Sequence, residues 1–577
     1  MKKLKYIGIG ICSLFLIPCS FAQQDTVSRS VTVEKEFRPV IQSAGKLNVS
    51  PERMEVQEPQ VNIVYSEEIA TDGLAYNAKP MRFPSRPFPS QEQKSGILDG
   101  GLGHFNTHLN FRYRVPVTGK ASKGVKLNLF AHHDAEWGVC TWEETTIGMD
   151  FVKQFSDLDI YFDVAGKNTF FTRFGRYYDG QKLTVKRYND LSEQDKQSIW
   201  GVNTNVGVRS KKNADVLYKV QIGYQAYIMP NQVAEHQIRT IANVEWNGDE
   251  HRAGADLVVR NAIFSVQDQL WLASDTNRNY TSRHGIRIHP YYKYVGDRLL
   301  VRVGANLDFN IGKGQMMSSN KQISFAPSPE VFVEYRIIPS WLAVYGGATG
   351  KFSFGTLDEY MDKCPYRSAS WSVNSTHVAS YIPVDAFLGF KVRATDNLLL
   401  DIYARYAYMK NQIVFYADST TTQPGGFVDY CYADYQRWKV GLELTYHYQD
   451  IIHLLFSGNY YHWISESIEN QDIWGYSSGT VYDRPAWDLH LRIDARIDSH
   501  WSLYSDNTFA GSFKMMTWQG EKKGKAYIGL NLGARYDFNS DLGIYVQLNN
   551  LLNRHNDRFY GYQLAGIQAT VGCSWKF

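Results

Sequence analysis

The chain has 577 residues, a formal charge of +3 and an aromatic content of 14%, including 39 Tyr and 14 Trp. Its mean hydropathy of −0.37 and its lack of several apolar runs of about 20 residues exclude a helical membrane protein. The sequence has no GxSxG, HExxH or P-loop pattern and no Cys/His cluster, so it predicts no enzyme, no cofactor and no metal site.

The first 22 residues have the layout of a secretory signal peptide. Three lysines precede an apolar run at Tyr6–Pro18, and Ser20-Phe21-Ala22 is a small-x-small cleavage site. Residues 1–22 hold three lysines and no acidic residue, so cleavage would change the formal charge from +3 to 0. A neutral mature chain argues against a nucleic-acid partner.

Residues 23–97 differ in composition from the rest of the chain. Six prolines lie between Pro51 and Pro89, and proline is excluded from helix interiors and central strands. We therefore expect an extended N-terminal segment in the periplasm or in the lumen of the following domain. Val61–Tyr65 is one candidate strand within it.

From Leu98 to the end, apolar and polar residues alternate over stretches of ten or more residues. The pattern is clear at 104–115, 301–311, 437–448 and 487–498. A period of two is that of a strand with one apolar face, and ordinary strands have about five or six residues. Aromatic residues gather at the ends of the apolar stripes, as they do at the two interfaces of a membrane.

The connections between these stretches alternate between short and long. Short ones include 156–159, 247–250 and 295–298, and long ones include 173–197 and 357–381. Transmembrane barrels have short periplasmic turns and long outer loops. We therefore predict an all-β fold, a transmembrane antiparallel β-barrel over residues 98–577. About 21 strands are visible, and an even number of about 22 requires Val61–Tyr65 or a missed segment.

The last 13 residues, AGIQATVGCSWKF, have the strand pattern up to the final position. Val571, Cys573, Trp575 and Phe577 share one apolar face with Ile567 and Ala569, while Lys576 points inward. We expect this strand to lie against lipid to its last residue and to close the barrel against the first strand.

A motif before this strand resembles the C-terminal end of TonB-dependent receptor barrels. Asn550-Leu551-Leu552-Asn553 is followed by Tyr560, Tyr562 and the final Phe577. The resemblance implies a barrel of about 22 strands in the cell outer membrane. It also implies that the β-barrel assembly machinery recognises the terminal strand, through Val571, Cys573, Trp575 and Phe577.

The N-terminal segment departs from that family's pattern. TonB-dependent receptors carry a plug domain of well over a hundred residues, whereas only about 75 residues lie between positions 23 and 97. The segment is similar in style to the N-termini of plugless barrels of Bacteroidota. We expect Leu74–Gln93 to lie inside or across the barrel mouth.

Polar residues on the inward face are candidates for chemistry. His132, Asp134 and Glu136 alternate on one predicted strand, where they could bind a divalent metal or activate water. Alternate residues on a strand stand about 7 Å apart, so they do not converge on one ion without a neighbouring strand. We interpret them as a polar lumen wall, together with a second set, Asp488, Arg492, Asp494 and Arg496.

Two functions fit these patterns. The first is an outer-membrane barrel that resembles a TonB-dependent receptor without a full plug and binds or translocates a nutrient. The alternative is a non-transporting structural or scaffold subunit of an outer-membrane complex, with the N-terminal segment binding a periplasmic or surface partner protein. A disulfide between Cys364 and Cys431, both in or beside predicted outer loops, is also expected.

Overall fold

The computed structural model describes residues 95–577 apart from 118–122, 138–140, 173–175, 180–181, 186–195, 212–213, 231–232, 267–281, 313–322, 360–363, 365–378, 418–427, 450, 469–478, 518–519 and 560–561. The described residues belong to one compact unit, Ser66–Phe577. The predicted signal peptide, the candidate strand at Val61–Tyr65 and the segment Leu74–Gln93 lie outside the described residues.

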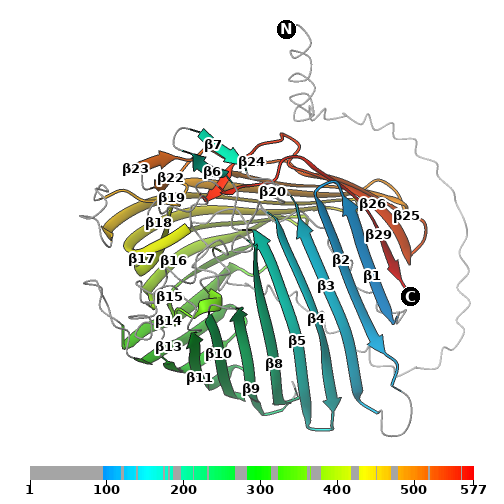
Figure 1. Cartoon of the computed structure of the whole chain (residues 1–577). Coiled ribbons are helices and arrows are strands. Elements are labelled where there is room, and N and C mark those ends of the chain that lie inside the picture. Colours follow the sequence, from blue (N-terminus) through cyan, green and yellow to red (C-terminus); the bar gives the residue numbers. More distant parts are fainter. Residues whose placement is uncertain are drawn as a thin grey trace, which may run out of the picture. The chain divides into compact units, whose positions relative to one another are not determined.

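Twenty-two antiparallel strands form a closed barrel (Figure 1), which confirms the predicted fold class. The first half of the wall consists of β1 (Gly96–Gly103), β2 (Asn106–Val115), β3 (Val125–Glu136), β4 (Trp142–Gln154), β5 (Leu158–Thr172), β8 (Lys196–Ser210), β9 (Val216–Met229), β10 (Val233–Asn247), β11 (His251–Val266), β12 (Arg283–Val295) and β13 (Leu299–Gly312).

The second half consists of β14 (Phe325–Ile338), β15 (Leu342–Ser353), β16 (Ser380–Thr395), β17 (Leu398–Ala417), β18 (Val428–Tyr448), β19 (Ile452–Ile468), β20 (Trp487–Arg496), β21 (Trp501–Ala510), β24 (Tyr527–Gly529) with β25 (Leu532–Asp537), β26 (Leu542–Asn549) and β29 (Gln568–Lys576). β24 and β25 are two parts of one strand of the wall, because both pair with β21.

Three short hairpins lie on the long connections, outside the 22-strand order. They are β6 (Arg176–Asp179) with β7 (Lys182–Val185), β22 (Lys514–Thr517) with β23 (Gly520–Lys523), and β27 (Asp557–Phe559) with β28 (Tyr562–Gln563). β22 also makes a short parallel pairing with the end of β17.

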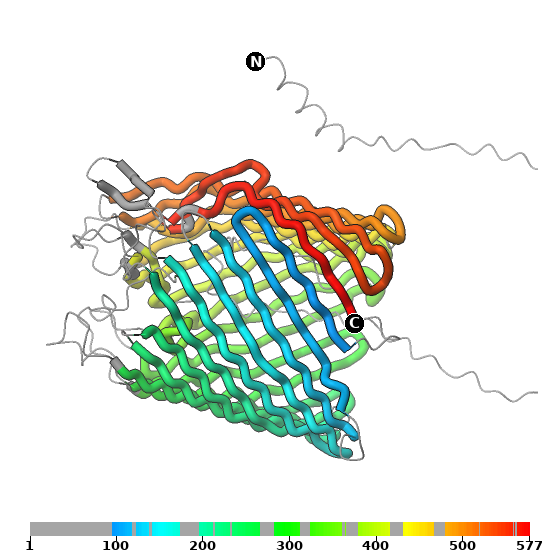
Figure 2. Tube along the Cα trace, turned by 45° about the vertical axis from the view of Figure 1, so that its right-hand side comes forward, coloured from blue at the N-terminus to red at the C-terminus, as the bar shows by residue number. Residues whose placement is uncertain are grey.

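The barrel closes between its first and last strands, which lie side by side in Figure 2. β1 and β29 pair from Ile97↔Lys576 to Gly103↔Thr570, and Gly96 and Phe577 exchange two backbone hydrogen bonds of 2.8 and 3.1 Å. The alternation of apolar and polar residues did not indicate the strand β1. Its sequence GILDGGLG contains four glycines, and glycine is depleted in strands.

The outer surface of the wall is apolar. Along β9, alternate residues from Val216 to Tyr224 are exposed, and Ile147, Ile497 and Val571 keep 62–63% of their surface exposed. Water does not stabilise a continuous apolar surface of this kind, whereas a bilayer does. The chain is therefore an outer-membrane barrel. Within the described ranges, no helix is long and apolar enough to cross a membrane.

The two ends of the barrel differ, as predicted. The turn end carries Ser95, Phe577 and short connections such as 155–157, 248–250 and 538–541. The loop end carries the long connections, among them 173–195, 267–282, 354–379 and 511–526. The connection from β2 to β3, residues 116–124, is the longest at the turn end.

The predicted disulfide between Cys364 and Cys431 is wrong. Both residues are thiols. Both are also buried, but they pack in different apolar clusters, Cys364 with Phe415 and Tyr432, and Cys431 with Met409 and Ile382. Loop placement and an oxidising compartment do not fix the geometry that a disulfide requires.

Candidate functional site: a chain segment held on the inner wall

Four neighbouring strands direct polar side chains to one region of the inner wall near the loop end. Because even-numbered residues of β9 and β10 face outward, Gln225 on β9 and Gln237 on β10 face the lumen. The same alternation turns Arg260 on β11 and Arg283 on β12 inward. The antiparallel register brings these residues, which are up to 58 positions apart, onto one surface.

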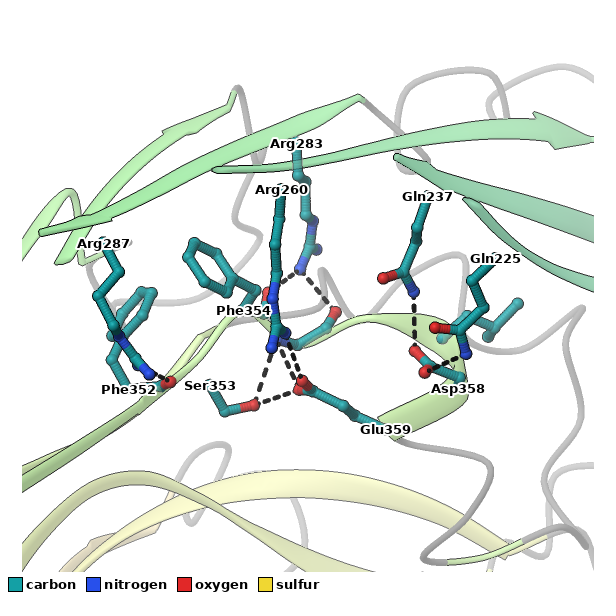
Figure 3. Close-up of polar contacts among 12 residues, drawn as sticks. Gln225, Gln237, Arg260, Arg283, Arg287, Phe352, Ser353, Phe354, Asp358 and Glu359 are labelled. Atoms are coloured by element: carbon teal, nitrogen blue, oxygen red, sulfur yellow. Dashed lines mark hydrogen bonds and ion pairs between the residues drawn. The ribbon is translucent and has the colours of Figure 1, made fainter. Parts of the chain in front are cut away.

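The segment Phe354–Glu359, which we name the lumenal segment, lies against this surface (Figure 3). It follows β15, and it turns away from the wall at Gly355, whose φ of +66° is a conformation that glycine adopts without strain. Arg283 fixes the turn by donating to the carbonyl oxygens of Phe354 at 2.9 Å and Gly355 at 2.8 Å.

Two carboxylates at the end of the segment meet side chains of the wall. Asp358 accepts hydrogen bonds of 2.9 Å from both Gln225 and Gln237. Glu359 forms an ion pair with Arg260 at 3.4 Å and accepts a 3.2 Å hydrogen bond from the Gly355 amide. The side chains of Arg260 and Glu359 both remain 30% exposed, so solutes in the lumen can reach this pair.

An apolar contact anchors the segment between these polar groups. Leu357 is 1% exposed and packs among Phe171, Ile199, Met229 and Val233, which are inward-facing residues of β5, β8, β9 and β10. The amide of Leu357 donates to the buried carboxylate of Glu235. Burying a leucine side chain stabilises by about 1.5–3 kcal/mol, so the lumenal segment is a packed part of the fold.

Other charges of the inner wall are paired more tightly. Asp385 is fully buried and accepts hydrogen bonds of 3.1 Å from both Arg405 and Arg437. His289 lies between Asp256, at 2.9 Å, and Glu330, which also binds Arg302 at 2.7 Å. Both networks neutralise charge within the wall, and the Asp385–Arg437 pair leaves no exposed surface for a solute.

A second polar cluster lies at the loop end, where residues 482–484 and β23 contact residues of β17 and β18. Tyr482 is fully buried and donates a 2.7 Å hydrogen bond to Glu521 of β23. The guanidinium of Arg484 stacks 4.4 Å above the Tyr435 ring. Asp483 accepts a 2.9 Å hydrogen bond from the Phe415 amide, and burial raises its pKa from 3.8 to about 7.

The predicted lumen residues all lie on the two strands that the sequence indicated. On β3, His132 contacts Asp134 at 2.8 Å, and Glu136 accepts a 3.1 Å hydrogen bond from Gln568. In the part of the chain that the structure describes, no group of three or more His, Cys, Asp or Glu side chains is arranged to hold a metal ion.

On β20, the structure places the second predicted set in local pairs. Asp488 accepts a 2.8 Å hydrogen bond from Asn459, and Arg492 contacts Asp494 at 2.9 Å. Arg496 pairs with Ser502 of β21 at the turn end. Among the described residues, no hydrogen bond or ion pair joins this set to the lumenal segment.

The terminal strand has the two faces that the pattern indicated. Val571, Cys573 and Trp575 are exposed on the outside, while Lys576 is buried on the lumen side. The Phe577 ring stacks on Tyr113 with centroids 6.1 Å apart and contacts Trp575 at 4.8 Å.

The sequence did not indicate the lumenal segment. Residues 357–381 were interpreted as an outer loop, but residues 357–359 lie against the inner wall. The sequence offered one signal for this surface, the inward-facing arginines at 239, 260, 283 and 287. The strand register that brings these arginines together is not visible in a single sequence.

Solved structures with the same fold include outer-membrane receptors and a copper transporter. No family model and no curated protein matches this sequence. The ferripyoverdine receptor of the outer membrane of Pseudomonas aeruginosa has a TM-score of 0.58 at 13% identity, over 85% of this chain and 73% of its own. The copper transporter OprC has a TM-score of 0.61 at 12% identity, over 86% and 82%.

The ferric-catecholate import receptor Fiu of Escherichia coli K12 is similar to the same degree, with a TM-score of 0.59 at 11% identity, over 84% of this chain and 82% of its own. The resemblance to TonB-dependent receptor barrels, first indicated by the C-terminal motif, is supported at the level of the fold.

Proposed function

We propose that this chain is a receptor-like barrel that binds a nutrient at its loop end and passes it through the lumen. The similar structures include receptors and a transporter for metal-containing nutrients, and a barrel of 22 strands has a lumen wide enough for such solutes. The nutrient and any energy coupling through the N-terminal segment are further parts of this proposal.

The observation that carries the proposal is how the lumenal segment is held. Its carboxylates contact two glutamines and an arginine, and the Arg260–Glu359 pair remains open to solutes. One leucine anchors the segment. A barrel that served only as a scaffold would need no segment with exposed polar contacts on its inner wall. A channel needs an element that restricts the lumen and yields to a solute.

Ion conductance in planar bilayers tests this function. We compare the wild type with Leu357→Ala, since truncating a buried leucine typically costs 2–5 kcal/mol and loosens its segment. The conductance should rise in this variant. Leu388→Ala is the matched control, because Leu388 is 55% exposed on the lipid-facing side.

Heat-modifiable migration on gels establishes that each variant has closed into a barrel. Folded barrels that never conduct, in wild type and variant alike, would refute the channel. If these non-conducting barrels co-purify in mild detergent with a periplasmic or surface protein at constant stoichiometry, the alternative function, a scaffold subunit, is supported instead of a channel.

A further inference from the structure

Two arginines of the inner wall stand directly opposite each other on adjacent strands. Arg239 of β10 is the register partner of Arg260 of β11, and both face the lumen. Residues in this relation have Cβ atoms about 4.5–5.5 Å apart, and like charges there are destabilising. Such a pair persists when a negative group lies between or above its charges.

Two further arginines extend this positive surface. Arg283 pairs in register with Ala262, and Arg287 pairs with Val258, so they flank Arg260 from β12. Arg287 is neutralised by Asp308 at 2.7 Å, and Arg283 is satisfied by the carbonyl oxygens of the lumenal segment. We name Arg239, Arg260, Arg283 and Arg287 the arginine site.

The negative charge that reaches Arg239 and Arg260 comes from the chain itself. Glu359 contacts Arg260, and Asp358 is held on the same surface by Gln225 and Gln237. Within the described residues, the Arg239 guanidinium has no hydrogen bond or ion pair. The Nε atom of Arg260 is buried and also lacks a hydrogen-bond partner. Buried donors are nearly always satisfied, so the Nε atom of Arg260 indicates an absent acceptor, and the half-buried Arg239 offers further donors beside it.

The exposure of its ion pair separates this site from the buried network around Asp385. Arg437 and Asp385 are 0% exposed, whereas Arg260 and Glu359 are each 30% exposed. An oxyanion from the lumen can therefore reach Arg260 and Arg239 without opening the wall. Planar guanidinium groups bind carboxylate and phosphate oxygens in pairs.

We propose that the arginine site binds a multiply charged oxyanion, a small carboxylate or phosphate compound, across Arg239 and Arg260, and that Glu359 competes with it for Arg260. This inference deepens the proposed uptake function, on which it rests, by naming the chemical class of the substrate. Bound anion displaces the Glu359 carboxylate and removes one of the contacts that hold the lumenal segment against the wall.

Titration calorimetry of the purified full chain in detergent tests the site. The probes are citrate and pyrophosphate, which distinguish a carboxylate ligand from a phosphate ligand. Raffinose is the neutral control. Arg239→Gln should weaken binding of the preferred anion by about tenfold or more, since it removes a charge-assisted pair. Glu359→Gln should tighten it by about tenfold, because the internal competitor is lost.

Two variants control for lumen charge in general. Arg492→Gln removes an inward arginine whose partners are Asp494 and Asp506. Glu144→Gln removes an inward carboxylate that pairs with Lys167 at 3.0 Å. Both should leave anion affinity within about twofold of wild type. Equal affinities in wild type, Arg239→Gln and Glu359→Gln, or equal binding of raffinose, would overturn the anion site.

The calorimetry does not depend on conduction, so the two proposals fail separately. Anion binding that requires Arg239, in a barrel that never conducts, supports the site and refutes the channel. Conductance that rises in Leu357→Ala, with no anion binding in any variant, supports the channel and overturns the site.

Discussion

Asp385 shows how single residues carry charge inside this barrel. Its carboxylate is fully buried and lies between Arg405 and Arg437, at 3.1 Å from each. Transferring such a charge from water costs several kcal/mol, which its hydrogen-bonded partners offset only while the pairing is complete. The residue is therefore sensitive to substitution in a way that exposed lumen charges are not.

Replacing Asp385 with Asn should lower the free energy of unfolding by about 3–5 kcal/mol, because the buried Arg437 and the mostly covered Arg405 lose their counter-charge. Asp494→Asn is the control, since Asp494 is 28% exposed beside Arg492, and it should cost no more than about 1 kcal/mol. Urea unfolding in detergent micelles, followed by tryptophan fluorescence, measures both. Equal losses would contradict the distinction between closed and open charge pairs.

Asp483 makes the packing of the loop end dependent on pH. Its pKa is raised from 3.8 to about 7 by burial, so the packed loop prefers the protonated acid. Below about pH 4 the acid is protonated whether or not the loop is packed, and the packing has its full stability. Between about pH 4 and 7 only the unpacked loop ionises, so stability falls as the pH rises and then levels off.

Hydrogen exchange of residues 479–486 in the wild type and Asp483→Asn, compared at the same pH values, measures this effect. The wild type should lose protection relative to the variant between pH 4 and 7, and the variant should keep it. Asp498→Asn serves as the control, because amides of His500 and Trp501 lower the pKa of that exposed carboxyl. A constant difference over the range would contradict the titration of Asp483.

Single elements show what the sequence could predict and where it failed. A strand between lipid and a polar lumen must alternate, so long alternating strands such as β18 and β20 were predictable from residue order. β1 was missed because its glycines carry no side chains to alternate. The lumenal segment was missed because its contacts join Leu357 to Glu235 and Asp358 to Gln225, residues 122 and 133 positions apart.

The terminal strand combines packing with the proposed assembly signal. We propose that Val571, Cys573, Trp575 and Phe577 are recognised during assembly, and that Phe577 also completes the seam by its hydrogen bonds with Gly96. Deleting Phe577, or Trp575→Asp, should reduce the heat-modifiable barrel in outer membranes more than Lys576→Asp does. A charge on the lipid face costs about 2–4 kcal/mol at mid-bilayer and less near the rim, so most of the loss should come from recognition.

Pulse-chase labelling, with the folded and unfolded forms separated on unheated gels, measures the rate of assembly. Lys576 is buried on the lumen side, so its variant reports on packing at the same end of the strand. Indistinguishable assembly of the three variants would contradict the role of the outward face.

At the scale of the whole molecule, two parts of the chain are candidates for closing the lumen. The lumenal segment lies on the inner wall of β9–β12, and the N-terminal residues 74–93 are predicted to lie inside or across the barrel mouth. A segment anchored by one leucine and two carboxylates covers only part of a lumen that 22 strands enclose. A second occupant is therefore expected, and the aromatic residues Tyr76, Phe83 and Phe88 suit residues 74–93 to this role.

Conductance measurements on three variants separate the two contributions: deletion of 74–93, Leu357→Ala, and both changes together. We expect each single change to raise the conductance and the combination to exceed either one, because the two occupants would restrict the same lumen independently. If deletion alone leaves the barrel closed while Leu357→Ala opens it, the lumenal segment is the restricting element. The N-terminal residues would then be better explained as an arm for a partner protein, and affinity purification of the deletion variant should show the loss of that partner.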